Sequence, residues 1–109
     1  MLIFLVMALL TTAACTSTLR AGKAGTDFIL GSSSDTGHAL LCESGDLQRV
    51  LGDTTLTESV KDALMQHICL RARSSEKTRQ LYRSLTDEQQ KDLLRAFKRH
   101  GYDVYAACG

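Results

Sequence analysis

Four cysteines and three histidines are the side chains of this 109-residue chain that could bind a metal or act as nucleophiles. Three of the cysteines have a histidine close by in the sequence, in the pairs His38 and Cys42, His67 and Cys69, and His100 and Cys108. Thiolate and imidazole are zinc ligands, and a cysteine next to a histidine can be a nucleophile. The chain has no CxxC or HxxxH spacing and no glycine-rich oxyanion loop, however. The pattern therefore predicts no metal, no cofactor and no enzyme activity.

Cys15 differs from the other cysteines in the residues that precede it. Leu2 to Leu10 form an unbroken apolar run, and Thr11 to Ala14 are small. The run is shorter than the roughly 20 residues of a membrane-spanning helix and suits the apolar region of a signal peptide. The stretch LIFLVMALLTTAAC resembles the lipobox signal of a bacterial lipoprotein precursor. No family resemblance extends beyond these residues.

The resemblance implies where the protein resides and how it is held. Residues 1–14 would be removed as a signal peptide, and Cys15 would carry a diacylglyceryl group and an acyl chain such as palmitate. Two or more acyl chains anchor a protein stably in a membrane. Thr16, rather than Asp, follows Cys15, which implies the outer membrane of the cell envelope, facing the periplasm. Cleavage after Ala14 without lipid attachment, or an uncleaved anchor, are the alternatives.

The cysteines that carry no lipid are expected to pair, because an exported chain meets an oxidising compartment. Cys42, Cys69 and Cys108 allow three pairings. Cys42–Cys69 would join two helical segments, whereas either pairing with Cys108 would fix the C-terminal tail, where Tyr102 and Tyr105 offer apolar surface. All three stay open, with a slight preference for a bridge to Cys108. The odd thiol could also bond to another chain.

Composition divides the rest of the chain into a tether and a helical domain. Residues 15–37 are rich in Gly, Ser, Thr and Ala and predict a flexible linker behind the lipidated cysteine. Only Phe28 to Leu30 interrupt it, as a short strand or an apolar plug that docks on the domain. From residue 38 to 109 the apolar spacing is helical.

Cap signals predict the boundaries of these helices. A broken helix covers about 37–52, a second starts after Thr57 and runs to about residue 72, and a third starts after Ser74 or Ser75. The last begins with a capping box at Thr86 and Gln89 and ends at Gly101. We therefore expect an all-α fold, a small three- to four-helix bundle behind the signal peptide and the flexible tether.

Charge is balanced overall but not along the chain. The formal net charge is +1, which gives no reason to expect nucleic acid as a partner. Residues 20–70 carry four cations against seven acids, whereas residues 71–100 carry nine cations against four. The nine predict a basic face: Arg71, Arg73, Lys77, Arg79, Arg83, Lys91, Arg95, Lys98 and Arg99. The simpler interpretation is a solvated helix surface.

Three functions are compatible with a lipid anchor and a small domain. The first is a structural or recruiting component of an envelope assembly, with membrane lipid and an envelope protein as partners. The second is an exclusion or immunity lipoprotein that blocks phage, DNA transfer or a toxin. The third is a binder of anionic envelope surfaces through the basic face.

Overall fold

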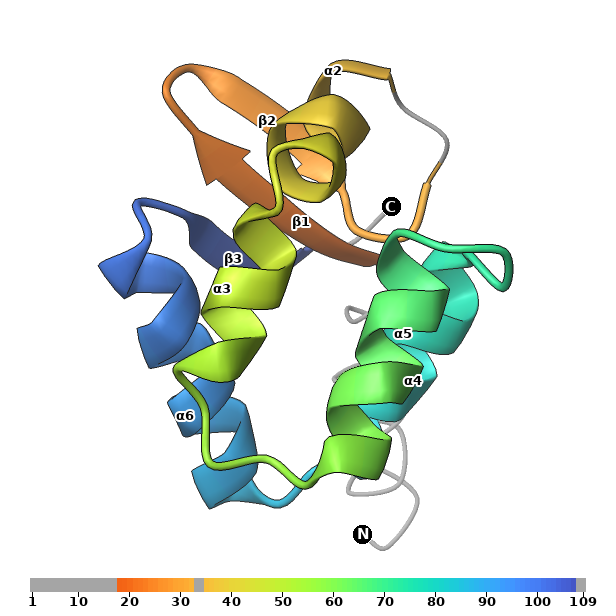
Figure 1. Cartoon of the computed structure of the whole chain (residues 1–109), viewed down its shortest axis with the longest axis vertical. Helices are drawn as coiled ribbons and strands as arrows, with labels where there is room; N and C mark the ends of the chain where they lie inside the picture. The colour runs from red at the N-terminus through yellow and green to blue at the C-terminus, as the bar shows by residue number, and fades with distance from the viewer. Residues whose placement is uncertain (1–17, 33–34, 108–109) are drawn as a thin grey trace, which may run out of the picture.

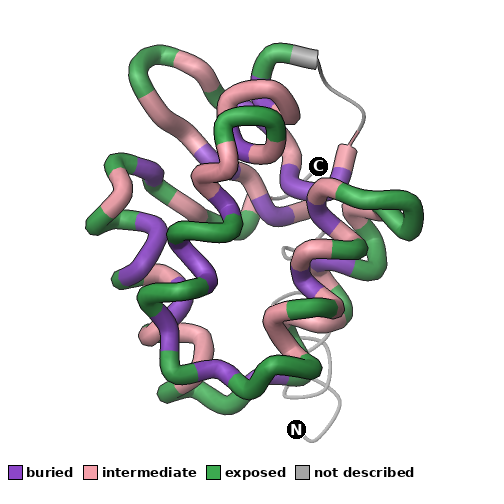
Figure 2. Tube along the Cα trace, in the orientation of Figure 1, coloured by how far each residue is buried: buried purple, intermediate pink, exposed green. Residues whose placement is uncertain are grey.

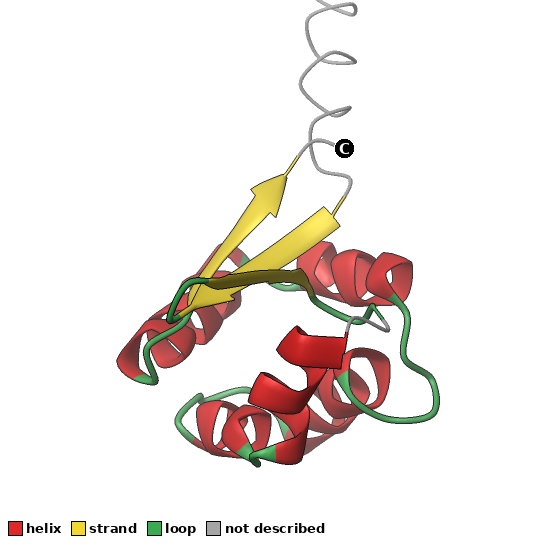
Figure 3. Ribbon diagram, turned by 90° about the horizontal axis from the view of Figure 1, so that it is seen from above, coloured by secondary structure: helices red, strands yellow, loops and turns green. Residues whose placement is uncertain are grey.

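The structure is a computed structural model that describes residues 18–32 and 35–107. Along the chain its elements are β1 (Thr18–Lys23), β2 (Thr26–Ile29), α2 (Asp35–His38), the π-helical turn η1 (Ala39–Glu43), α3 (Asp46–Gly52), α4 (Glu58–Ile68), α5 (Ser75–Ser84), α6 (Asp87–Arg99) and β3 (Asp103–Ala107). The strands form one antiparallel sheet in the order β2-β1-β3 (Figure 1). The helices lie to one side of this sheet (Figure 3).

The all-α bundle predicted from the sequence is therefore wrong, and the protein has a mixed fold of helices and a sheet. β1 and β2 come from residues assigned to the flexible tether, and β3 comes from the C-terminal tail. In β1, Leu19 and Ala21 are buried, while Arg20 between them is only partly covered. This alternation is the period of a strand with one covered face. Two buried residues among Gly, Thr and charged neighbours are too few for the sequence pattern to indicate a strand.

A two-residue turn at Ala24 and Gly25 joins β1 to β2. Both residues have positive φ, 52° and 83° respectively, as in the tight turns that match the twist of a hairpin. Glycine adopts this conformation readily, but alanine rarely does. The sequence of this turn is Ala-Gly rather than the Asn-Gly or Asp-Gly that is typical of such turns. For this reason the sequence pattern does not predict the hairpin.

The C-terminal strand closes the sheet beside the first strand. β3 pairs with β1 from Thr18 opposite Ala107 to Gly22 opposite Asp103. We call the end of the sheet with Thr18 and Ala107 the terminal end, and the opposite end, with the turn between β1 and β2, the hairpin end. The pairing of β1 with β3 brings the two ends of the described chain to one place.

Of the two tyrosines of the predicted C-terminal tail, Tyr102 is buried and Tyr105 is exposed.

The predicted helix starts are confirmed by their caps. The side chains of Thr57, Ser74 and Thr86 each accept a hydrogen bond from a backbone N–H three residues later. Thr86 and Gln89 form the predicted capping box, and Gly101 has the left-handed φ of 86° expected after the last helix. These signals act over one helical turn, so they do not depend on the rest of the fold.

The core lies between the sheet and the helices. Buried apolar side chains from both include Leu19, Ala21, Phe28, Leu30, Leu41, Leu47, Val50, Leu64, Leu93 and Phe97. A Cβ atom on Gly37 would overlap Cγ of Phe28, so only glycine fits where α2 crosses β2. Among the described residues, none of the helices has the length and apolar character needed to cross a membrane.

Candidate functional site

Cys42 and Cys69 form a disulfide that joins η1 to the end of α4, with Cα atoms 5.6 Å apart. This bond excludes both pairings with Cys108, so the slight preference for a bridge to Cys108 is wrong. Cys108, and the predicted lipidation site Cys15, lie outside the described residues. The bridged cysteines are 27 positions apart, and a loop of that size lowers the entropy of the unfolded chain enough to stabilise the fold by about 3.5 kcal/mol.

The three histidines lie at separate places, and each contacts an oxygen atom. His38 Nε2 is 3.3 Å from the Cys69 carbonyl, His67 Nδ1 is 3.2 Å from the Ala72 carbonyl, and His100 Nε2 is 2.6 Å from Oδ2 of Asp53. Within residues 18–32 and 35–107, no three His, Cys, Asp or Glu side chains gather as a metal site would require. Each histidine instead connects a loop to a neighbouring segment.

A partly buried polar network occupies the hairpin end beside α3. The carboxylate of Asp46 accepts hydrogen bonds from the Tyr102 hydroxyl at 2.8 Å, from Lys23 Nζ at 3.2 Å and from Arg49 Nη2 at 2.6 Å. Lys23 Nζ also lies 4.4 Å from the centre of the Tyr102 ring, within the range of a cation–π contact. The network links β1 and α3 to Tyr102, the residue immediately before β3.

The network shifts the ionisation of its two acids in opposite directions. Burial alone would raise the pKa of the Asp46 carboxyl, but the hydrogen bonds from Tyr102, Arg49 and Lys23 outweigh burial and lower this pKa to about 2. Burial, together with the hydrogen bond to Asp46, raises the pKa of the Tyr102 hydroxyl. Asp46 is therefore an anion and Tyr102 a neutral donor at any physiological pH, which suits a structural role.

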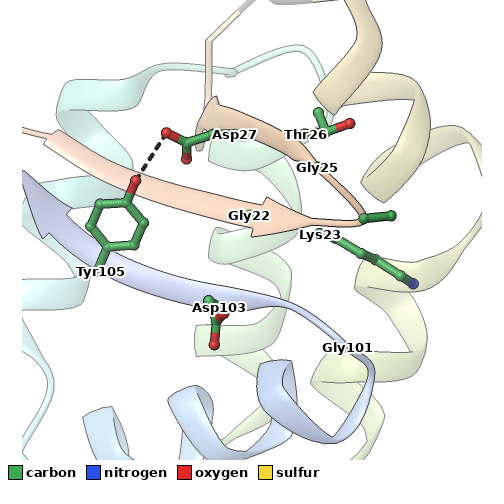
Figure 4. Close-up of a pocket in the computed structure, with 9 residues that line it drawn as sticks. Gly22, Lys23, Gly25, Thr26, Asp27, Gly101, Asp103 and Tyr105 are labelled. Carbon is green, nitrogen blue, oxygen red and sulfur yellow. Dashed lines mark hydrogen bonds between the residues drawn. The ribbon is translucent and has the colours of Figure 1, made fainter.

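An open cavity of about 470 Å³ lies on the sheet near the hairpin end. Three glycines are among its lining residues, and Tyr105 of β3 and Asp27 of β2 point toward each other over β1 (Figure 4). The Tyr105 hydroxyl donates to Asp27 Oδ2 at 2.9 Å, and Arg20 Nε donates to the same oxygen at 3.0 Å. Both hydrogen bonds reach the same carboxylate oxygen of Asp27 and connect β2 to side chains of β1 and β3.

The nine cations of the predicted basic face form two groups in the structure. Two lie in the loop between α4 and α5, three on α5 and four on α6: Arg71 and Arg73; Lys77, Arg79 and Arg83; Lys91, Arg95, Lys98 and Arg99. α5 and α6 lie on opposite sides of the molecule (Figure 1). Within the described part of the chain none of the nine forms an ion pair, whereas each of the four cations of residues 20–70 does.

The first group follows an exposed apolar side chain in the chain. Leu70 is 48% exposed, and Arg71, Arg73 and Lys77, within the next seven positions, are exposed as well. The loop between α4 and α5 is accordingly coloured as exposed in Figure 2. We call Leu70, Arg71, Arg73 and Lys77 the loop patch.

The second group borders a groove of about 260 Å³ on α6. Its walls are Lys91, Arg95 and Lys98, which share one helix face at i, i+4 and i+7, and its apolar residues are Leu94 and the half-buried Val104 of β3. We call these five residues the α6 groove. Cations around an apolar floor can hold an anionic group beside an apolar one.

The sequence pattern indicates the cations of the α6 groove, but not the residue from another element, Val104, that lies beside them. The spacing of Lys91, Arg95 and Lys98 was sufficient to place them on one helix face. Val104 joins them only because β3 packs along α6, and this contact has no local signal. No protein-family model, curated protein or solved structure matches the chain, so we infer its function from its own residues.

Proposed function

We propose that this chain is a bacterial envelope protein held at the membrane by lipid on Cys15, whose disulfide-bonded domain recruits a second envelope protein. The run from Leu2 to Cys15 supports the anchor, because small residues before a cysteine suit removal of a signal peptide and lipid attachment. The Cys42–Cys69 disulfide supports export, since such bonds persist in oxidising compartments.

The α6 groove is the surface that supports recruitment of a second envelope protein. Lys91, Arg95 and Lys98 are exposed and form no ion pair with a described residue, although they share one helix face. Arg95 interacts electrostatically with Asp92, but cations in excess of nearby acids still raise the local positive potential and attract an anionic partner. The apolar floor would give such a partner a place for one apolar side chain. A partner segment with acidic residues around an apolar one fits this groove.

The anchor is tested by the intact mass of the protein extracted from membranes with detergent. We expect a chain that begins at Cys15 and carries the mass of a diacylglyceryl group and one acyl chain. Substitution Cys15→Ala should abolish the lipid mass and leave the domain unattached to membranes. A wild-type protein whose mass corresponds to an unmodified chain beginning at Met1 would refute the anchor.

Recruitment is tested by a photo-reactive amino acid placed at Leu94 in the lipidated protein in cells. We expect a cross-link to one defined envelope protein, which the triple variant Lys91→Ser, Arg95→Ser, Lys98→Ser loses. The control is Arg79→Ser, Arg83→Ser, which removes two cations of α5 that form no ion pair with a described residue and should keep the cross-link. A cross-link that survives the α6 substitutions, or none at all, would contradict the proposal.

A further inference from the structure

We infer that the loop patch, Leu70, Arg71, Arg73 and Lys77, docks on the anionic phospholipid surface of the same membrane that holds the Cys15 lipid. The inference rests on the proposed lipid anchor and adds a second, non-covalent contact with the membrane. It would fix the orientation of the domain, so that one side faces the lipid and the other faces the periplasm.

The distance from the anchor to the folded domain is short. β1 begins at Thr18, three positions after Cys15. Three residues span at most about 10 Å even when fully extended. The long tether predicted from the sequence is therefore replaced by a connection that must keep the terminal end of the sheet close to the lipid headgroups.

The loop patch leads into the start of α5, which packs beside the start of β1. The Leu30 N–H donates to the Leu19 carbonyl at 2.9 Å, which places Leu30 beside the start of β1. The next residue, Gly31, packs so closely on the first turn of α5 that a Cβ on it would lie 2.6 Å from the Ser74 carbonyl oxygen. The loop between α4 and α5 is on the same side as the start of β1 in Figure 1. A membrane close to Thr18 is thus within reach of this loop.

The loop is held in shape by internal hydrogen bonds. The N–H groups of Leu70 and Ser74 donate to the carbonyls of Met65 and His67 at 3.1 and 2.8 Å. The Thr78 hydroxyl, which is fully buried, lies 3.1 Å from the His67 carbonyl. The Cys42–Cys69 disulfide fixes the residue immediately before Leu70. These hydrogen bonds and the disulfide therefore hold the backbone of the loop in the conformation that leaves Leu70 exposed.

The chemistry of the patch matches a lipid surface with negative headgroups. Arginine and lysine are attracted to anionic lipids within about a Debye length, some 8 Å at physiological salt. An apolar side chain between them can enter the boundary between headgroups and acyl chains. Glu76 is the one acid among residues 65–86, which carry five cations. Its Oε1 accepts a hydrogen bond from Gln80 at 3.4 Å, one turn further along α5.

The same orientation leaves the α6 groove free. α6 lies on the side of the molecule opposite to α5 and the loop (Figure 1). A domain that rests on the membrane by its loop patch would present the α6 groove away from that contact, where a second envelope protein can reach it.

Tryptophan fluorescence tests the inference, because the chain has no tryptophan of its own. We would purify the lipidated full chain with Leu70→Trp and incorporate it into phosphatidylcholine vesicles with or without phosphatidylglycerol. We expect a blue-shifted emission that brominated acyl chains quench only in the anionic vesicles. The control Gln48→Trp, at an exposed position on α3, should stay unquenched in both. Each substitution of Arg71, Arg73 or Lys77 by Ser should lower the ratio of docked to undocked protein about fivefold.

The outcomes separate this inference from the proposed function. A lipidated protein whose Leu70→Trp emission matches the Gln48→Trp control in anionic vesicles would overturn the docking and leave the anchor intact. A response to soluble poly-glutamate but not to the vesicles would also overturn it, since the patch would then bind an acidic protein. A protein with no lipid on Cys15 would overturn both the anchor and the inference that rests on it.

Discussion

At the hairpin end of the sheet, Lys23 and Arg49 both bind the carboxylate of Asp46, whereas in the loop between α4 and α5 Arg71 and Arg73 bind no acid among the described residues. The residue types are the same, and the surroundings differ. The hairpin end has a largely covered acid, Asp46, which receives three hydrogen bonds, while no described acid forms an ion pair with the loop cations. The cations at the hairpin end hold the fold together, and those of the loop are available to an external anion.

The difference follows from where acids occur in the chain. Residues 71–100 have four acids for nine cations. Three of these acids lie at the start of α6 or accept hydrogen bonds from Thr55. Asp87 and Glu88 lie in the first turn of α6, where the helix dipole favours a negative charge. Asp92 accepts hydrogen bonds from the backbone and hydroxyl of Thr55, and the backbone bond is the main cause that lowers the pKa of its carboxyl. The composition therefore leaves positive charge for binding.

The largest effect on stability is expected from the Cys42–Cys69 disulfide, which fixes the start of the loop between α4 and α5. Replacing Cys42 and Cys69 together by Ser should lower the free energy of unfolding by about 3.5 kcal/mol, because the unfolded chain gains the entropy of an open loop. Denaturant unfolding measures this difference. Reduction of the wild-type protein should have a similar effect, and a double variant as stable as the wild type would show that the loop is held by its hydrogen bonds alone.

The next largest effect should come from Gly31, which joins the terminal end to α5. Gly31 and Gly25 both have a φ of 83°, but a Cβ on Gly25 would meet nothing within 4 Å. Gly25→Ala should therefore cost only backbone strain, about 1 kcal/mol. Gly31→Ala adds a clash with the Ser74 backbone and should cost about 3 kcal/mol. Equal losses in thermal or denaturant unfolding would mean that the contact between β1 and α5 adapts freely.

The network at the hairpin end should make stability depend on pH. The pKa of Asp46 is lowered to about 2 in the folded state from an ordinary 3.8, so its contribution is complete above about pH 4 and is lost as the pH falls through 2. Its size is about 2 kcal/mol. Asp46→Asn should remove this dependence and destabilise the protein at pH 7 by a similar amount. The exposed Asp62→Asn is the control and should change stability by less than about 0.5 kcal/mol.

The smallest effects compare one substitution at a paired and an unpaired lysine. Lys23→Gln removes an ion pair and a contact with the Tyr102 ring and should cost about 1 kcal/mol in free energy of unfolding. Lys77→Gln removes an exposed cation with no described acid partner and should cost less than about 0.5 kcal/mol. If Lys77→Gln destabilised the domain as much as Lys23→Gln, the charge of the loop patch would serve the fold rather than binding.

Helix positions were predictable because their signals are local. Thr57 and Thr86 cap helices through hydrogen bonds from residues three positions later. Four consecutive residues are therefore enough to recognise each cap in the sequence. The sheet was not predictable in this way. β1 pairs with β3, and the partners Thr18 and Ala107 are 89 positions apart in the sequence. Neither strand has a long alternating pattern. Leu19 and Ala21 in β1, and Val104 in β3, carry too little signal on their own.

The candidate surfaces show the same division. The nine cations, their helix spacing and the shortage of acids beside them are properties of the sequence. Which cations face a common groove, and which lie near the lipid attachment site, depends on contacts between distant segments such as Gly31 with Ser74 and Val104 with α6.

The sequence by itself determined the helix caps, the charge asymmetry and the pattern that predicts an anchor at Cys15. The tertiary structure decided that Cys42 pairs with Cys69, that the supposed tether folds into β1 and β2, and that the cations divide between two sides of the molecule. The physical reason is range. Caps and charge act over one helical turn or through composition, whereas a disulfide and a sheet join residues that only the complete fold brings together.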